Sequence, residues 1–171
     1  RVERRTVGGT FAQVVATGPN ATSAVVPGLT PSTFYLFRVR AAGGGGTASA
    51  YSNEAGATTL GNVAPCVPND ETLCLNDGRL RADLVWRTAS DSGRGHAVPI
   101  RSAPDSGLLY FFSRANIELL VKVLDACIFE RYWVFFAATT NVEFALTVTD
   151  TQTGKTGGYF NPLNRAAPPV Q

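Results

Sequence analysis

Short runs of alternating apolar and polar residues, separated by turn-forming residues, extend over the whole chain. Residues 80–86 alternate in this way and directly follow Asn76-Asp77-Gly78, a typical hairpin turn. No helical period of about 3.6 residues lasts for more than about two turns. The 17 glycines and 10 prolines among 171 residues fall largely between the apolar runs. The pattern predicts an all-β protein of about a dozen short strands.

The composition excludes several classes of protein. Hydrophobic residues make up 44% and charged residues 16%, which excludes a disordered charged tail. A net charge of +2 gives no basis for nucleic-acid binding, which needs a concentrated basic surface. The longest apolar stretches, Leu108–Phe112 and Tyr132–Ala138, are too short to span a bilayer. We therefore expect neither a nucleic-acid partner nor a membrane span.

A change of composition near residue 60 indicates two units. All cysteines and both tryptophans follow this point, and a small-residue segment ending at Pro65 precedes the first cysteine. We predict a first unit at 1–60, a linker at 61–65 and a second unit at 66–171. The strands expected in the first unit are Val2–Arg5, Phe11–Ala16, Ser23–Val26, Phe34–Ala41 and Ser49–Thr59.

Residues 28–41 (GLTPSTFYLFRVRA) and 49–59 of the first unit carry a family pattern. They resemble the corner, the following strand and the last strand of a fibronectin type III domain. The resemblance implies an immunoglobulin-like β-sandwich in which Leu29 packs in the core. It also implies that the Tyr35 hydroxyl bonds back to the chain, forming a tyrosine corner.

The first two strands of that family have no counterpart in residues 1–60. A sandwich without them exposes core side chains and an unpaired sheet edge, at Val2 and Val25 in particular. Three explanations are open: the chain is a piece of a longer protein, a neighbouring molecule adds strands, or the second unit covers the surface. The start at Arg1 and the absence of methionine favour a mature product or a fragment.

The second unit also reads as a β-sandwich, with six or seven strands. The expected strands are Leu80–Trp86, Leu108–Phe112, Glu118–Asp125, Arg131–Ala138, Glu143–Asp150 and Lys155–Phe160. The segments 66–75, 118–125, 132–135 and 147–151 together resemble a module found near the C-terminus of secreted bacterial proteins. The resemblance covers most of residues 66–165 and implies an extracellular or cell-surface location, not a reaction.

The cysteine spacing favours one short disulfide. Cys66 and Cys74 flank a short polar segment and can close a small loop, although two buried thiols are the alternative. Cys127 follows an apolar run and is then an unpaired, buried thiol, unless it pairs with one of the other two. No second pair of closely spaced cysteines indicates zinc.

Two aromatic segments admit three interpretations. Residues 110–112 and 132–136 fill a core, form an exposed sugar-binding row, or make a protein–protein contact. The candidate assembly residues there are Tyr110, Phe112, Tyr132, Trp133 and Phe135.

Catalytic patterns are weak. His96 has no paired nucleophile nearby in the sequence, and Ser92 and Ser106 lie in Asp-Ser-Gly turns without a nucleophile-elbow context. The scattered loop aspartates lack an organised calcium-binding spacing, so we expect no cofactor, with calcium as the minor alternative.

We therefore expect a non-enzymatic, extracellular structural protein of bacterial origin. It is a subunit or module of a surface or secreted assembly such as a fibre, held together by β-strand addition between copies or adjacent domains. The alternative is an adhesion or carbohydrate-binding accessory module of a secreted hydrolase, with polysaccharide as its partner.

Overall fold

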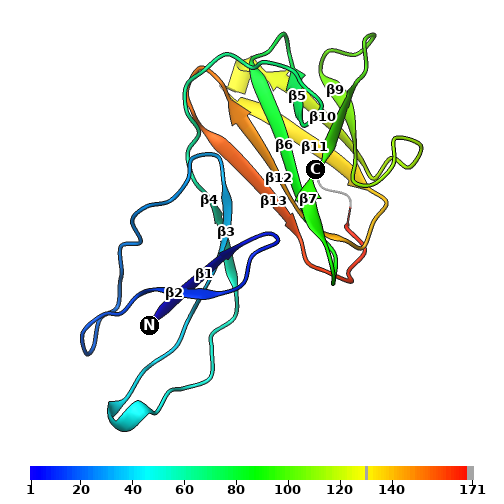
Figure 1. The fold of residues 1–171 in the computed structure, drawn as a ribbon. Helices are drawn as coiled ribbons and strands as arrows, with labels where there is room; N and C mark the ends of the chain where they lie inside the picture. Colours follow the sequence, from blue (N-terminus) through cyan, green and yellow to red (C-terminus); the bar gives the residue numbers. More distant parts are fainter. Residues whose placement is uncertain (130, 169–171) are drawn as a thin grey trace.

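The protein is all-β in the computed structural model, which describes residues 1–129 and 131–168 (Figure 1). Thirteen strands in these residues form three antiparallel sheets. Two short 3-10 turns, Gly44–Gly46 and Cys127–Phe129, lie in the connections between strands. No helix in this part of the chain is long and apolar enough to cross a membrane.

The N-terminal sheet has four strands in the order β2-β1-β3-β4. Their bounds are β1 Val2–Thr6, β2 Ala12–Val15, β3 Phe34–Val39 and β4 Ala55–Thr58. The expected strand at Ser23–Val26 is wrong, because these residues lie outside any strand. The expected strand Ser49–Thr59 is shortened to its last part, since the Ser49 and Ser52 hydroxyls accept hydrogen bonds from Ala41 and Val39 amides instead.

The other two sheets form the C-terminal sandwich. One sheet has the order β11-β10-β9-β8 and the other the order β13-β12-β6-β5, with β7 also paired to β6. The bounds are β5 Thr72–Leu75, β6 Leu80–Arg87, β7 Ser92–Arg94, β8 His96–Pro99, β9 Ser106–Tyr110, β10 Leu119–Ala126, β11 Arg131–Ala138, β12 Glu143–Asp150 and β13 Thr156–Asn161. The turn between β5 and β6 has positive φ at Asn76, Asp77 and Gly78, as its residue types favour.

The inward-facing side chains of these two sheets make one continuous core. Leu84, Leu109, Val121, Val123 and Phe144 are completely buried in it. The predicted disulfide is confirmed: Cys66 and Cys74 are bonded, with their Cα atoms 5.8 Å apart. It attaches the end of the linker to β5, while the side chain of Cys127 lies outside the described part of the chain.

Strand β12 is buried on both faces because the N-terminal sheet packs on the outside of the sandwich. Phe34 of β3 stacks on Phe160 of β13 with ring centroids 5.1 Å apart, and Leu36 packs near Ala145. The close approach requires a glycine at 158, since a Cβ there would stand 1.8 Å from the Thr58 hydroxyl oxygen. In Figure 1 the blue and cyan sheet accordingly lies beside the orange strands β12 and β13.

A buried carboxylate joins the two parts. Glu143 accepts two hydrogen bonds from Arg5 of β1 (2.8 and 3.1 Å) and two from Arg87 of β6 (3.0 and 2.8 Å). Burial raises the pKa of Glu143, but the hydrogen bonds from Arg5 and Arg87 outweigh it and hold the pKa below its ordinary value. Glu143 is 2% exposed, so removing either cation leaves buried charge without a full set of partners.

The predicted linker is attached to the sandwich. The Gly61 amide donates to the Gly154 carbonyl at 2.8 Å, and the Thr156 hydroxyl donates to the Thr59 carbonyl at 3.0 Å. These bonds fix where the N-terminal sheet emerges relative to β13.

Candidate functional site

The two faces of the N-terminal sheet differ sharply in what covers them. The face toward the sandwich carries Phe34 and Leu36 in its centre. The opposite side, which we call the open face, is defined by cross-strand register and consists of Val2, Arg4, Thr6, Ala12, Val15, Tyr35, Phe37, Val39, Ala55 and Ala57. No second sheet lies over the open face within the described residues. Of the three explanations left open by the sequence, coverage by the second unit does not hold, because that unit packs on the other side, against Phe34 and Leu36.

Tyr35 is the one well-buried side chain of the open face. It is 5% exposed, and its hydroxyl accepts a hydrogen bond from the Thr30 amide at 3.0 Å. The resemblance to a fibronectin type III domain implies a hydrogen bond of this kind, between the tyrosine hydroxyl and the chain a few residues earlier. Leu29 beside it is half-buried.

Exposure increases along β3 away from that corner. Phe37 is half-buried, and Val39 is 48% exposed. Val2, paired with Val39, is half-buried as well. An apolar strip that becomes steadily more exposed is typical of a core from which one layer is missing.

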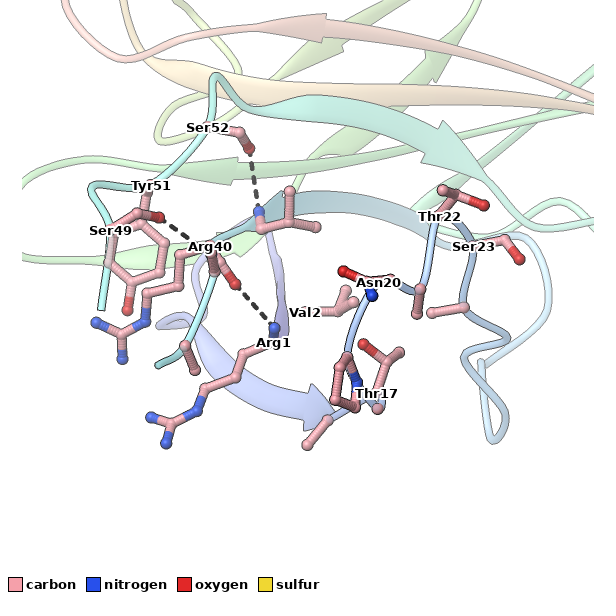
Figure 2. A pocket seen from close by; sticks show the side chains of 18 of the residues that line it. Arg1, Val2, Thr17, Asn20, Thr22, Ser23, Arg40, Ser49, Tyr51 and Ser52 are labelled. Atoms are coloured by element: carbon pink, nitrogen blue, oxygen red, sulfur yellow. Dashed lines mark hydrogen bonds between the residues drawn. The ribbon is translucent and has the colours of Figure 1, made fainter. Parts of the chain in front are cut away.

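A hollow of about 880 Å³ lies at this exposed end of the sheet (Figure 2). Val2 and Val39 line it, with residues 16–24 on one side and residues 49–52 on the other. Two hydrogen bonds hold its rim: the Arg1 amino group donates to the Arg40 carbonyl at 2.8 Å, and the Val39 amide donates to the Ser52 hydroxyl. The hollow gives access from solvent to the apolar strip.

Arg4 occupies the middle of the open face with an unsatisfied donor. Its guanidinium lies over the Tyr35 ring, 5.1 Å from the centroid. Its Nη1 is buried and has no hydrogen-bond acceptor within the described residues. A buried donor without an acceptor is costly, which makes this arginine a locally unfavourable feature of the open face.

Val25 shows why the strand expected at Ser23–Val26 does not form. It is 85% exposed, and positive φ at Asn20 and Gly28 turns the chain on either side of the segment. No amide from 23 to 26 donates a backbone hydrogen bond in the described part of the chain. A strand needs a neighbouring strand, and none of the described strands pairs with this segment.

The aromatic residues of β11 divide between two environments. Tyr132, Val134 and Phe136 face inward, whereas Trp133 and Phe135 point outward, with Trp133 45% exposed. The Trp133 and Phe129 rings stack with their centroids 5.8 Å apart. Leu124, which pairs with Trp133 on the neighbouring strand β10, is half-buried.

The outer face of this sheet continues over its other strands. Leu120 is 43% exposed, and Tyr110 stacks on His96 at 4.8 Å. Phe112 is 55% exposed and packs edge-on against Trp86 at 4.8 Å. The structure thus brings Tyr110, Trp133 and Phe135 onto one sheet face, while it places Tyr132 on the inner side and Phe112 beyond the end of β9.

The remaining sequence candidates do not converge. His96 lies on β8 against Tyr110, and the Ser106 hydroxyl donates to Asp105 at 2.7 Å. Ser92 belongs to β7. In the part of the chain that the structure describes, no three His, Cys, Asp or Glu side chains come together as a possible metal site.

Sequence reasoning missed Arg4, Glu143 and Arg5. Arg4 and Arg5 lie on β1, and Glu143 is the first residue of β12. In β1 (Val2-Glu3-Arg4-Arg5), strand geometry predicted only that successive side chains lie on opposite faces of the sheet. That alternation contains the signal for Arg4, because it shares the side of Val2. The pairing of Arg5 with Glu143 depends on the packing of two sheets and has no local signal.

Comparison with known proteins gives no relatives for this chain. No protein-family model matches it, and no curated protein or solved structure is significantly similar.

Proposed function

We propose that the chain is a non-catalytic, extracellular structural module that is joined to other copies of itself by β-strand addition. In this proposal the open face of the N-terminal sheet receives strands from a neighbouring copy, which complete a second layer over it. The observation that carries the proposal is the open face itself: an apolar strip through Val2, Phe37 and Val39 with no covering layer in the described residues.

One further feature supports an incoming strand. The amides of Ser23–Val26 are unpaired, so an added strand can complete a ladder with this segment. The disulfide Cys66–Cys74 is consistent with an oxidising, extracellular location.

Sedimentation velocity of the 1–171 chain tests this proposal. We expect the weight-average sedimentation coefficient to rise with protein concentration as copies associate. Val39→Lys places a charge in the exposed end of the apolar strip, so this variant should remain monomeric over the same concentrations.

The matched control is Leu120→Lys, which adds the same charge at a residue of similar exposure, 43% against 48%, on the sandwich. It should associate like the unmodified chain. The proposal fails if the unmodified chain is monomeric throughout, or if Leu120→Lys abolishes association while Val39→Lys does not.

Carbohydrate binding is a second candidate function. It is favoured by the partly exposed Trp133, whose ring stacks on Phe129, since sugar rings pack on exposed aromatic faces. Titration with cellotriose, followed by tryptophan fluorescence, tests this candidate. A saturable change that Trp133→Ala removes supports it, and the absence of any change contradicts binding of this sugar at that face.

A further inference from the structure

A cleft opens at one side of the C-terminal sandwich, between edge strand β11 of one sheet and β12 and β13 of the other. Its volume is about 570 Å³, within the usual range of ligand-binding pockets. We propose that this cleft binds a saccharide containing uronic acid residues, that is, sugar rings that carry a carboxylate. The inference rests on the carbohydrate-binding candidate and is independent of strand addition to the open face.

The walls of the cleft are apolar and aromatic. Tyr132 and Val134 line it from β11, and Tyr159 lines it from β13. The Phe136 ring packs edge-on against Tyr159 at 5.4 Å, which fixes the orientation of that tyrosine. Gly157 lines the cleft next to Tyr159, and a Cβ there would be in ordinary van der Waals contact with the Tyr159 hydroxyl, at 3.5 Å. Aromatic side chains that line a cleft suit the apolar C–H face of a sugar ring.

A fixed ion pair forms part of the same wall. Arg79 donates two hydrogen bonds to Asp150, at 2.8 and 2.9 Å, and its guanidinium lies 5.6 Å from the centroid of the Tyr132 ring. The hydrogen bond from Arg79 holds the pKa of Asp150 well below its usual range, and bonds from Gln152 and Thr153 add to the effect. The charges of Arg79 and Asp150 therefore offset each other, and the pair serves as a rigid, polar surface.

The other charged residues leave the cleft positive. Its lining contains three cations, Arg79, Arg131 and Lys155, and two carboxylates, Asp125 and Asp150. Lys155 makes no ion pair within residues 1–129 and 131–168. An exposed ammonium beside aromatic walls attracts an anionic ligand, and a sugar carboxylate combines that charge with a ring that packs on tyrosine.

The chain has two lysines, which makes the test direct. Lys155 lines the cleft, whereas Lys122 lies on the outer sheet face and is ion-paired with Asp105 at 3.0 Å. Reductive methylation with ¹³C-formaldehyde keeps the charge and labels both lysines and the Arg1 amino group for NMR, and Lys155→Gln and Lys122→Gln assign the two lysine signals. Trigalacturonic acid should shift the Lys155 methyl signals saturably and leave those of Lys122 in place. Its methyl ester, which lacks the carboxylate charge, should produce no shift.

Calorimetry of the unlabelled chain gives the affinity. Lys155→Gln should weaken binding of trigalacturonic acid by roughly tenfold, as expected for the loss of one charge-assisted hydrogen bond, and Lys122→Gln should leave it unchanged. The cleft proposal fails if the Lys155 signals do not move, or if both lysines respond equally. If cellotriose changes the Trp133 fluorescence while trigalacturonic acid leaves Lys155 unaffected, the carbohydrate-binding function stands and the cleft proposal falls. If neither saccharide binds, both are overturned.

Discussion

The C-terminal sandwich and the N-terminal sheet are built from similar strands but reach different degrees of closure. In the sandwich, two sheets enclose a core in which Phe144 is completely buried. The N-terminal sheet packs one face on the outside of that sandwich and leaves Val39 on its other face 48% exposed. The same alternating pattern thus yields a closed core in one region and an open face in the other.

The difference shows that alternating apolar and polar residues predict a strand with one buried face, but do not reveal which part of the molecule covers that face. Both faces of β12 are covered, and one of the covering layers comes from residues more than a hundred positions away in the sequence. The open face has an equally regular pattern with no layer over it in the described residues. Burial depends on the presence of a partner surface, which can belong to the same chain or to another molecule.

The largest expected effect tests the contrast between the two regions directly. Phe144→Ala should lower the free energy of unfolding by about 3–5 kcal/mol, because it leaves a cavity in a closed core. Phe37→Ala, on the open face, should cost less than about 1.5 kcal/mol in the monomer, because water already reaches the site. Urea denaturation of both variants measures the difference. Equal losses would show that the open face is as well packed as the core.

The second effect concerns the contact between the regions. Glu143→Ala should cost about 3 kcal/mol, since it leaves Arg5 and Arg87 without their buried carboxylate. Glu54→Ala is the control: this carboxylate is 3.7 Å from Arg5 but largely in solvent, and its removal should cost less than about 1 kcal/mol. The same denaturation experiment measures both. A loss for Glu143→Ala no larger than that of the control would mean that the ion pair does not hold the sheet to the sandwich.

The pH dependence follows from the same carboxylate. The pKa of Glu143 in the folded protein lies below its ordinary value of 4.5, so the ion pair contributes its full stabilisation above that pH. The stabilisation is lost as the pH falls below about 4.5 and through the lower folded pKa, where the carboxylate is protonated. We expect a steeper loss of stability as the pH falls below about 4.5 in the unmodified chain than in Glu143→Gln, measured by thermal unfolding. If the unmodified chain and Glu143→Gln lose stability identically with falling pH, the Glu143 carboxylate does not cause the acid sensitivity.

The smallest effect lies at the corner of the open face. Tyr35→Phe removes the hydroxyl that accepts the Thr30 amide, and it should cost about 1 kcal/mol while leaving the ring in place. Tyr159→Phe provides a comparison in the sandwich, where the tyrosine hydroxyl makes no hydrogen bond with the described residues, and should be close to neutral. A larger cost at Tyr159 than at Tyr35 would contradict this assignment.

Much of the strand pattern was predictable from the sequence, because alternation and turn residues are local. β11 and β12 have the bounds expected from their apolar runs, and the short loop between Cys66 and Cys74 is closed as proposed. The strand at Ser23–Val26 failed because its formation requires a neighbour that the local sequence does not reveal. Alternation puts Tyr132 and Trp133 on opposite faces of β11 but does not say which of the two is exposed, and the open face could be recognised only after the packing of the two regions was known.

Hydrogen exchange of the Ser23–Val26 amides tests the central claim most directly. These amides make no backbone hydrogen bonds in the described part of the chain, so they should exchange rapidly in the monomeric Val39→Lys variant. In the associated form of the unmodified chain, strand addition should pair them and protect them from exchange. If they exchange equally fast in both forms while protection appears on the outer face of β10 and β11, copies associate through the sandwich, and the proposed completion of the open face is wrong.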